Sequence, residues 1–473
     1  MEQNKSELQA TAVQENKMGV MPIPRLLTGM ALPMILSMLV QACYNIVDSI
    51  FVARIKDDVI TSGSAGTAAL NAVGMAFPIQ MLLIAFGTGT CVGVNALLSK
   101  ALGEKDQKTA DQAANQGIFL SFCNFLLFFI IGIFFSETLI RMQGGTGQVL
   151  TYGTQYLTIV CVGSIGIYTQ FIFERLLQST GKTFYTMITQ MFGALINIAL
   201  DPIFIFGLFG MPEMKVAGAA LATITGQICA AILAVILNAK KNTDVHVNLR
   251  GFRPQIKIIS RIYQVGIPSI IMQAIGSVMT SSMNRILSGL NMDSVAVFTV
   301  YFKLQSLFFM PVFGLNNGMV PILAYNYGAR KRKRMVQTVK LSMLYAFLFL
   351  FVGFLLFELM PEKLLRIFDT GDPSLITLGV PALKIIGFHY LAAWFSIISG
   401  TVFQALGNGI YSLVVSVARQ LLVLIPVAYL LAGLGGLKLI WWAFPIAEVI
   451  SLCISAILLI RIYRKVVRPI PLS

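Results

Sequence analysis

Charged residues are scarce in this chain of 473 residues, and their scarcity excludes most classes of soluble protein. Only 12% of the residues are charged, 56% are apolar, and the mean hydropathy is +0.79. Water does not solvate a compact globule of that composition, because too few polar side chains are present to cover its surface. The chain is therefore expected to be an all-α integral membrane protein, with the lipid bilayer as its main partner.

Histidine and cysteine are also rare, which argues against an enzyme, a metal cluster and a disulfide framework. The two histidines, His246 and His389, lie far apart in the sequence, and the loops between apolar runs are too short to hold a reactive constellation. The six cysteines lie within apolar runs without a CxxC spacing, so we interpret them as packing residues. The sequence thus predicts no enzymatic activity and no cofactor.

Long apolar runs fill most of the chain. A helix needs about 20 predominantly apolar residues to cross the hydrocarbon core of a bilayer, and twelve runs meet that length. An even number of spans places both termini on the same side of the membrane. The twelve predicted transmembrane helices are 27–54, 66–98, 112–136, 149–177, 184–209, 215–238, 262–287, 295–326, 338–359, 375–404, 411–433 and 438–460.

Basic residues outnumber acidic ones, which gives a net charge of +15. A nucleic-acid-binding protein spreads such residues over a water-facing surface, whereas here they gather between apolar runs, so no nucleic-acid partner is expected. We count 24 of the 35 Lys and Arg residues on the side that holds the termini. Because basic residues concentrate in cytoplasmic loops, both termini are predicted to be cytoplasmic, in a multi-pass protein of the cytoplasmic membrane.

The first six spans resemble the last six. Three landmarks recur in the same order, 225 to 235 positions apart, which indicates an internal duplication. Because each copy holds six spans, both copies have the same orientation, and the repeat is parallel. Two six-helix bundles that face a central cavity can rock against each other, which is the geometry of alternating access. The paired landmarks are Pro33 and Pro268, Gly103 and Gly328, and Gly181 and Gly407.

The duplication divides the chain into two lobes joined by a polar linker. The predicted segments are a cytoplasmic tail (1–24), an N-terminal six-helix lobe with the ion site (25–239), a cytoplasmic linker (240–257), a C-terminal six-helix lobe (258–465) and a second cytoplasmic tail (466–473).

Polar side chains interrupt the apolar runs of the N-terminal half. Asp48 lies in the first span, Asn197 and Asp201 lie one turn apart in the fifth, and Thr223 lies in the sixth. Ionisable groups at bilayer depth are costly and by default indicate function. These four residues are predicted to couple transport to an ion. Their oxygens suit a hard cation such as sodium, with Asp48, Asn197 and Asp201 as ligands, and the carboxylates equally suit a proton.

Structural roles compete with this interpretation. Asp48 would need a buried cation as its partner, but the candidates lie in the other half of the chain. Asn197 can bridge helices by hydrogen bonds, and Thr223 can bond back to its own helix. The candidate cations are Lys303, Lys384 and Arg419.

Residues 33–55, which contain Gln41, Tyr44 and Asp48, are similar to the first helix of the multidrug and toxic compound extrusion (MATE) family of secondary antiporters. The resemblance covers almost the whole chain, and the order of the fragments makes it specific. The other matching stretches are 72–78, 177–181, 197–202, 216–223 and 325–328.

The resemblance implies a functional monomer that exports drugs or organic cations, driven by a sodium or proton gradient through an ion site in the N-terminal lobe. It also implies that Gln41, Tyr44 and Gln190 line the substrate cavity, although contacts between helices are an alternative role for them. The substrates would be small cationic or amphipathic molecules, and their efflux would confer antibiotic resistance.

Two other transport functions are compatible with twelve spans, and four further charged residues lie in or near the spans. A flippase for lipid-linked oligosaccharide or polysaccharide from the same superfamily is the alternative function, although many flippases have more spans and a more basic cavity. A passive channel would not need a coupling carboxylate in one lobe. Arg419 and Glu448 are predicted to form a structural ion pair, with a proton relay as the alternative role, whereas Glu174 and Arg175 are interpreted as charges at the membrane interface.

Overall fold

The computed structural model describes residues 16–53, 55, 65–248, 250, 252–367 and 373–471. Helices make up nearly all of these residues, and no β-strand occurs among them. This is expected in lipid, where each backbone polar group needs a partner within its own segment. The predicted tails lie partly outside the described residues.

The N-terminal half, up to the predicted linker, forms one bundle. Its helices are α2 (Lys17–Val20), α3 (Ile23–Ala53), α4 (Ala65–Gly103), α5 (Gln107–Phe134), α6 (Ser136–Met142), α7 (Gly147–Val162), α8 (Ile165–Ser179), α9 (Thr183–Phe206), η1 (Leu208–Gly210) and α10 (Lys215–Lys241).

The C-terminal half repeats this arrangement. Its helices are α11 (Ile256–Leu290), α12 (Met292–Gly328), α13 (Arg332–Leu359), α14 (Pro361–Arg366), α15 (Pro373–Gly387), α16 (Tyr390–Ala405), α17 (Gly409–Val417), η2 (Ala418–Leu424), α18 (Ile425–Gly435), α19 (Leu437–Ile440), α20 (Ala443–Ile462) and η3 (Tyr463–Val467).

The number of spans agrees with the sequence prediction. In the described part of the chain, ten helices are long and apolar enough to cross a membrane, and two bent pairs bring the total to as many as twelve. The bent pairs are α7 with α8, at 44°, and α15 with α16, at 52°. Both correspond to the fourth span of a lobe, so the bend is part of the repeated plan.

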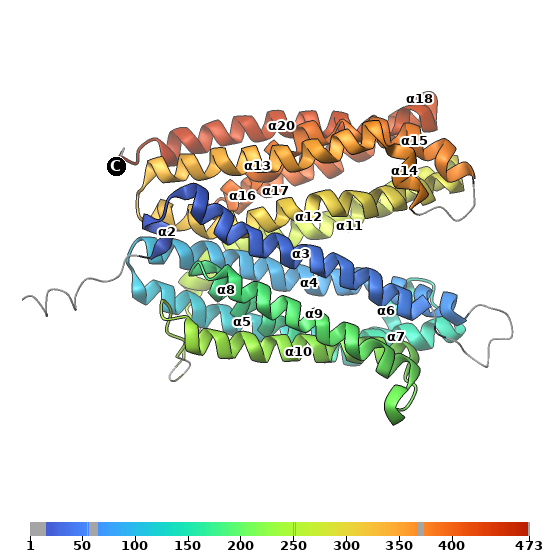
Figure 1. Ribbon diagram of the computed structural model, residues 1–473, viewed down its shortest axis with the longest axis horizontal. Coiled ribbons are helices and arrows are strands. Elements are labelled where there is room, and N and C mark those ends of the chain that lie inside the picture. Colours follow the sequence, from blue (N-terminus) through green and yellow to red (C-terminus); the bar gives the residue numbers. More distant parts are fainter. Residues whose placement is uncertain are drawn as a thin grey trace, which may run out of the picture.

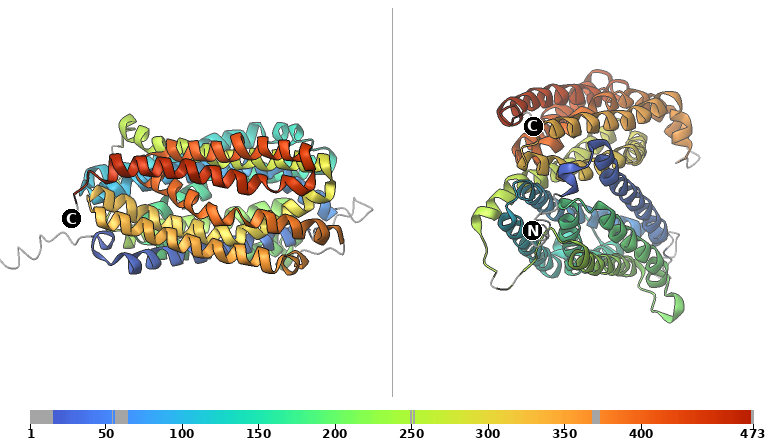
Figure 2. Two further views of the ribbon diagram at one scale, coloured as in Figure 1. Left: turned by 90° about the horizontal axis from the view of Figure 1, so that it is seen from above. Right: turned by 60° about the vertical axis from the view of Figure 1, so that its left-hand side comes forward.

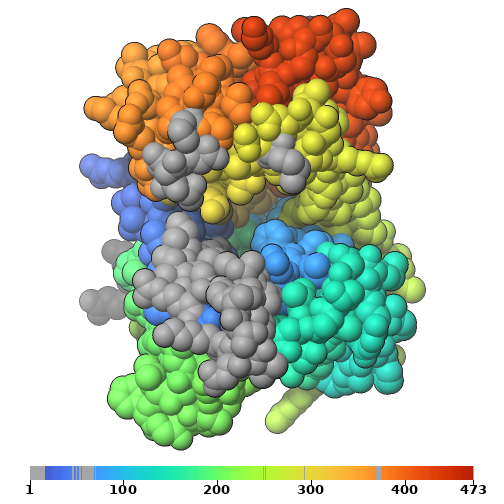
Figure 3. Space-filling model, turned by 90° about the vertical axis from the view of Figure 1, so that its right-hand side faces the viewer, coloured from blue at the N-terminus to red at the C-terminus, as the bar shows by residue number. Residues whose placement is uncertain are grey.

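The two bundles lie one against the other along their length (Figure 1). The helices of the two lobes come close at the end that holds α2 and the C-terminus, and they diverge toward the opposite end (Figure 1). The right-hand view of Figure 2 shows the same separation into lobes, with α3, in blue, between them. Viewed from the end away from the termini, the lobes are separate masses with a recess between them (Figure 3).

Glycines bring the helices of the two lobes together in a symmetric way. A Cβ atom at Gly93 of α4 would lie 2.1 Å from the Ile262 carbonyl oxygen of α11. A Cβ atom at Gly318 of α12 would lie 2.8 Å from the Ala31 Cα atom of α3. Because Gly318 stands 225 positions after Gly93, the second helix of each lobe packs closely on the first helix of the other lobe.

The same symmetry closes the end near the termini. A Cβ atom at Gly103 would lie 2.0 Å from the Tyr325 carbonyl oxygen, and one at Gly328 would lie 2.1 Å from the Lys100 carbonyl oxygen. Lys100 also places its ammonium group 5.1 Å from the ring centroid of Tyr327. The ends of α4 and α12 are therefore in backbone contact, and the closure depends on the absence of side chains at both glycines.

The short helix α2 lies across this closed end. Met18 is fully buried, and its carbonyl oxygen accepts hydrogen bonds from Asn326 Nδ2 (3.0 Å) and from Arg334 Nη2 (3.0 Å) in the C-terminal lobe. Asn16 Nδ2 donates to the Thr180 carbonyl oxygen (3.2 Å) in the N-terminal lobe. The segment thus links both lobes in the closed arrangement.

The surroundings of Lys17, the basic residue of α2, disfavour its positive charge. Burial and the nearby charge of Lys182 lower the pKa of Lys17, while the carboxylate of Asp244 acts in the opposite direction. Asp244 is itself paired with Lys182, with 2.7 Å between the ammonium nitrogen and the carboxylate oxygen.

Candidate functional site

The four residues predicted to couple an ion lie in the half of the N-terminal lobe that is remote from the termini. Asp48 and Asp201 each stand five residues before the end of their helices, α3 and α9, and Thr223 lies near the start of α10. Asp201 is fully buried, Asn197 is 3% exposed and Thr223 is 9% exposed. The structure therefore holds polar side chains from three helices inside the apolar part of one lobe.

Two glycines explain how α9 and α10 come close enough to bring these residues together. A Cβ atom at Gly193 of α9 would lie 3.0 Å from the Gly226 carbonyl oxygen, and one at Gly226 of α10 would lie 2.7 Å from the Gly193 carbonyl oxygen. One turn beyond this crossing, Asn197 Nδ2 donates to Thr223 Oγ1 (3.3 Å) and to Asp201 Oδ1 (3.4 Å). Both bonds are long, so the amide bridges its neighbours loosely.

Thr223 combines two of the roles considered from the sequence. Its hydroxyl donates to the Ala219 carbonyl oxygen (3.0 Å), which is the bond back to its own helix. The same oxygen accepts the bond from Asn197. The hydroxyl proton is therefore engaged by the backbone of α10, and a lone pair of the oxygen faces the Asn197 amide.

Three buried oxygens in this cluster have no hydrogen-bond partner among the described residues: Asp48 Oδ1, Asn197 Oδ1 and Asp201 Oδ2. A buried acceptor without a partner is costly, so a cluster of three calls for an explanation. The charges of Asp48 and Asp201 act on each other, and Tyr44 interacts electrostatically with both. Oxygen acceptors that lie this close to one another suit a hard cation or a proton.

The three residues predicted to bind substrate lie in different surroundings. Gln41 is exposed and Tyr44 is partly buried beside the two aspartates. Gln190 accepts a hydrogen bond from the Ser37 hydroxyl of α3 and donates through Nε2 to Glu174 Oε2 of α8 (2.7 Å). Gln190 is thus part of a polar network between helices, and a substrate role for the three residues stays a prediction.

Glu174 is the functional candidate that the sequence interpretation missed. It is 2% exposed rather than an interface charge, and Oε1 accepts hydrogen bonds from Gln170 Nε2 (2.9 Å) and Thr189 Oγ1 (2.9 Å). Its other oxygen accepts the bond from Gln190, so the carboxylate is fully surrounded by donors. The signal available in the sequence was Gln170, one turn before Glu174 in an otherwise apolar span.

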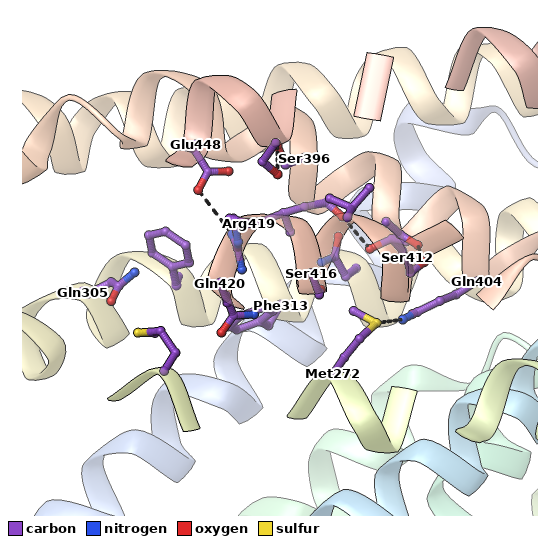
Figure 4. A pocket seen from close by; sticks show the side chains of 18 of the residues that line it. Met272, Gln305, Phe313, Ser396, Gln404, Ser412, Ser416, Arg419, Gln420 and Glu448 are labelled. Atoms are coloured by element: carbon purple, nitrogen blue, oxygen red, sulfur yellow. Dashed lines mark hydrogen bonds and ion pairs between the residues drawn. The ribbon is translucent and has the colours of Figure 1, made fainter. Parts of the chain in front are cut away.

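A cavity of about 520 Å³ opens between the lobes, mostly within the C-terminal lobe (Figure 4). Its wall combines aromatic side chains such as Phe309 and Phe313 with amide and hydroxyl groups. Among the described residues, Gln41, Tyr44 and Gln190 do not line it. The residues that contribute amide and hydroxyl groups to the wall include Gln305, Asn316, Ser396, Gln404, Ser412, Ser416 and Gln420.

The ion pair predicted in the C-terminal lobe is confirmed and lies in the wall of this cavity. Arg419 Nη1 is 3.3 Å from Glu448 Oε2, and Glu448 is 4% exposed (Figure 4). Arg419 and Gln420 belong to η2, a π-helical segment within the eleventh span. Segments of this kind are rare and often mark functional positions, because they turn side chains away from the regular helical path.

The N-terminal lobe also contributes to the cavity, through Val92, Asn95 and Arg175. Arg175 Nη1 donates to Gln178 Oε1 (2.8 Å) and, across the lobe boundary, to Asn317 Oδ1 (3.1 Å). Arg175 is therefore a contact between the lobes at the wall of the cavity, and the sequence interpretation of an interface charge did not anticipate that contact.

Comparison with known proteins agrees with this architecture. The family model named MatE matches residues 33–203 and 268–430, one match in each lobe. The multidrug export protein MepA of Staphylococcus haemolyticus (strain JCSC1435) is 26% identical over 420 residues, which are 89% of each chain. MepA of Staphylococcus aureus (strain bovine RF122 / ET3-1) is 25% identical over 439 residues, 93% of each chain.

Solved structures show the same fold. A multidrug resistance MATE family transporter of the MOP superfamily, described as being in an outward-facing conformation, has a TM-score of 0.88 at 23% identity. The alignment covers 97% of this chain and 99% of that one. A MOP superfamily transporter from Pyrococcus furiosus, for which a binding pocket of reverse polarity is described, has a TM-score of 0.86 at 23% identity, covering 96% and 99%. Because the family model matches more than half of the chain and falls on both lobes, the chain belongs to the MatE family.

Proposed function

We propose that this protein is a secondary active antiporter that exports drugs or organic cations across the cytoplasmic membrane, in exchange for protons or sodium ions, by alternating access of its two lobes. The relatives named as multidrug export proteins support the direction and breadth of transport. The excess of Lys and Arg at the end that holds the termini supports a cytoplasmic position for that end.

The observation that carries the proposal is the group of three unpaired oxygens on Asp48, Asn197 and Asp201. They are buried in one lobe, whereas the large cavity lies mostly in the other lobe. Separate sites are compatible with antiport, provided that the ion and the substrate act in opposite directions on the same conformational equilibrium. The ion changes the equilibrium only if it binds one conformation better than the other.

The mechanism follows from the positions of the charges. An ion that enters from the open end reaches Asp48 and Asp201 near the ends of α3 and α9, and neutralises part of their mutual repulsion. Relief of that repulsion allows α3 and α9 to pack more closely and releases the contacts that hold the end near the termini closed. A charge that moves inward through 100 mV gains about 2.3 kcal/mol.

The substrate is proposed to bind in the cavity described above. Aromatic side chains provide stacking surface for flat amphipathic molecules, and flexible methionines such as Met272 and Met279 adapt to different shapes. The amide groups of Gln305, Gln404 and Gln420 offer both donors and acceptors. A wall of this kind accommodates varied ligands, as multidrug transport requires.

Transport in proteoliposomes tests the proposal. With independently imposed sodium and pH gradients, the wild-type protein is expected to accumulate a fluorescent organic cation in response to at least one of them. Asp48→Asn, at equal reconstitution, is expected to lose this response, while Asp293→Asn, an exposed aspartate at the start of α12, retains it. A gradient response that survives in Asp48→Asn would remove the coupling role from this cluster.

A flippase for lipid-linked oligosaccharide is the second candidate, and one observation favours it. The cavity wall carries two guanidinium groups, Arg175 and Arg419, against one carboxylate, Glu448. That balance suits an anionic headgroup better than a cation. Transfer of a fluorescent lipid-linked sugar between leaflets, in vesicles that show no cation accumulation, would favour this alternative.

A further inference from the structure

A second hollow lies on the outer surface at the end near the termini, away from the ion cluster and the central cavity. It has a volume of about 540 Å³. It lies between the first turn of α3, the first four turns of α13 and the segment η3 at the end of the last span. Its lining residues are Pro24, Arg332, Lys333, Val336, Gln337, Lys340, Leu341, Leu344 and Tyr463.

The exposed residues of α13 in this hollow form one stripe. Lys333, Gln337, Lys340 and Leu344 are all exposed, and their spacing of four, three and four residues places them on one helical face. At 1.5 Å per residue, the stripe from Lys333 to Leu344 is about 16 Å long. It therefore runs from the polar end of the helix into the part of the membrane where apolar side chains face lipid.

The polar groups in the hollow are arranged as donors. Arg332 Nη2 donates to the Tyr463 hydroxyl (2.8 Å), and the Arg332 guanidinium lies 5.6 Å from the centroid of the same ring. Because the Tyr463 oxygen accepts from Arg332, its own proton is available for an external acceptor. Within the described part of the chain, Lys333 and Lys340 have no acidic partner. The hollow thus offers two ammonium groups, a phenol and a guanidinium edge to one ligand.

No acidic residue neutralises these charges locally. The three segments that surround the hollow, 16–47, 294–357 and 449–471, contain no aspartate or glutamate. Two basic residues that neighbour Lys333 are already used: Lys331 Nζ donates to the Gly19 carbonyl oxygen (3.0 Å), and Arg334 bonds to Met18 and Met21. Lys333 and Lys340 point instead to the outer face. A cation would be repelled from this place, and an anion is required to balance it.

We propose that the hollow binds one anionic phospholipid. Its phosphate lies among Lys333, Lys340 and the Tyr463 hydroxyl, and an acyl chain lies along Leu341 and Leu344 toward the exposed Leu348. A free phosphate would leave the apolar floor of the hollow unused. Basic pockets between helices at the cytoplasmic side of membrane proteins provide this kind of headgroup site.

The lipid would touch both lobes in the arrangement described here. Pro24 belongs to α3, whose first turns pack with the C-terminal lobe although the helix continues into the N-terminal lobe, while the basic stripe belongs to α13. The site also lies beside the contacts of α2 that link the lobes. Binding is inferred from the charges and shape of the hollow alone and does not depend on the proposed transport function.

Native mass spectrometry of the full-length protein, released from vesicles of phosphatidylcholine with a titrated fraction of phosphatidylglycerol, tests the proposal. Wild type is expected to retain one phosphatidylglycerol more tightly than the rest. Lys333→Gln with Lys340→Gln is expected to weaken this retention about thirtyfold, since each basic residue near an anionic headgroup contributes about fivefold. Tyr463→Phe is expected to weaken it by a smaller factor.

Matched control variants distinguish binding of the lipid at this hollow from general attraction of anionic lipid to a basic surface. Lys240→Gln with Lys241→Gln removes two exposed charges from the same end of the molecule, at the end of α10, and is expected to leave the retained lipid in place. An equal loss in that control, or unchanged retention after the loss of Lys333 and Lys340, would overturn the proposal. Displacement of the retained lipid by millimolar glycerol phosphate would assign the hollow to a soluble phosphate instead.

Discussion

Asp48 in the N-terminal lobe and Met283 in the C-terminal lobe occupy matching places on the first helix of each lobe. Pro268 stands 235 positions after Pro33, and Met283 stands the same distance after Asp48. Met283 is fully buried in an apolar core, whereas Asp48 has a buried oxygen without a partner among the described residues. The repeat has thus kept the helix and changed its chemistry.

The fifth span of each lobe shows the same contrast. Asp201 precedes Pro202 in α9, and Ile425 precedes Pro426 in α18. In the C-terminal lobe, Glu448 stands at a different position, where the guanidinium of Arg419 compensates it. A carboxylate with a built-in cation has little need of an external one, while Asp48 and Asp201 have no ion-pair partner among the described residues. We therefore propose that the N-terminal lobe responds to the ion, while the C-terminal lobe forms most of the cavity wall.

The largest effect on transport is expected from substitution of the acidic residues that distinguish the two lobes. Asp201→Asn is expected to abolish gradient-driven accumulation, because the variant keeps the size of the side chain and removes the charge that an ion would neutralise. Glu448→Gln is expected to reduce transport while keeping its response to the gradient. Loss of coupling removes the contribution of the ion gradient, which is about tenfold in the accumulation ratio for each 1.4 kcal/mol that the gradient supplies.

The readout is the ratio of internal to external substrate in proteoliposomes at equal protein content. A Glu448→Gln variant that loses its gradient response while Asp201→Asn keeps it would reverse the assignment of the two lobes.

Much of this comparison was accessible from the sequence. The length of the apolar runs predicted twelve spans, the recurring prolines and glycines predicted the parallel repeat, and the ion pair between Arg419 and Glu448 was predicted from two charges in adjacent spans. Each of these follows from local composition or periodicity. Glu174 was misread, because its burial depends on how α8 packs against α9, and a single charge near the end of a span is consistent with either environment.

Other features depend on tertiary geometry that no local pattern encodes. The π-helical segment η2 arises within a run of ordinary apolar residues, and the bend between α7 and α8 falls where the sequence shows one continuous span. The link between α2 and both lobes consists mainly of bonds to backbone carbonyl oxygens, which any residue supplies. Such contacts leave no signature in residue type.

A smaller effect on transport is expected from substitution of the two glycines that are related by the repeat at the closed end. Gly103→Ala and Gly328→Ala are expected to impair closure to the same degree, since each added Cβ atom meets a backbone oxygen of the other lobe within 2.1 Å. Backbone cannot rotate away as a side chain does, and overpacking of this kind costs about 1–3 kcal/mol. Transport is expected to fall about tenfold in each variant.

Spin labels at positions 108 and 333, which are exposed and related by the repeat, report the closure as a distance between the lobes. Gly29→Ala and Gly289→Ala serve as matched controls, because an added Cβ atom at either position has no atom within 4 Å. A wild-type distance distribution in Gly103→Ala would show that the glycine contact does not limit closure.

The smallest expected effect concerns the helix that follows each of these glycines. Asp106 caps α5, with Oδ1 accepting from the Thr109 amide (3.0 Å) and Oδ2 from the Thr109 hydroxyl (2.6 Å). Lys331, 225 positions later, stands before α13 without a side-chain cap. Asp106→Ala is therefore expected to lower the free energy of unfolding by about 1 kcal/mol at neutral pH. Lys331→Ala is expected to cause no loss of capping, because Lys331 provides no side-chain cap.

The pH dependence identifies the cap as the cause. The two bonds from Thr109 lower the pKa of Asp106 below its usual value of 3.8. The stabilisation is therefore fully present above that value and is lost as the pH falls through the lowered pKa. Thermal unfolding of the two variants and the wild type, measured from neutral to acid pH in one detergent, should show the Asp106→Ala difference shrinking in acid, with no such trend for Lys331→Ala. A difference that persists unchanged in acid would mean that Asp106 stabilises α5 by packing, and the two lobes would then begin their third spans in the same way.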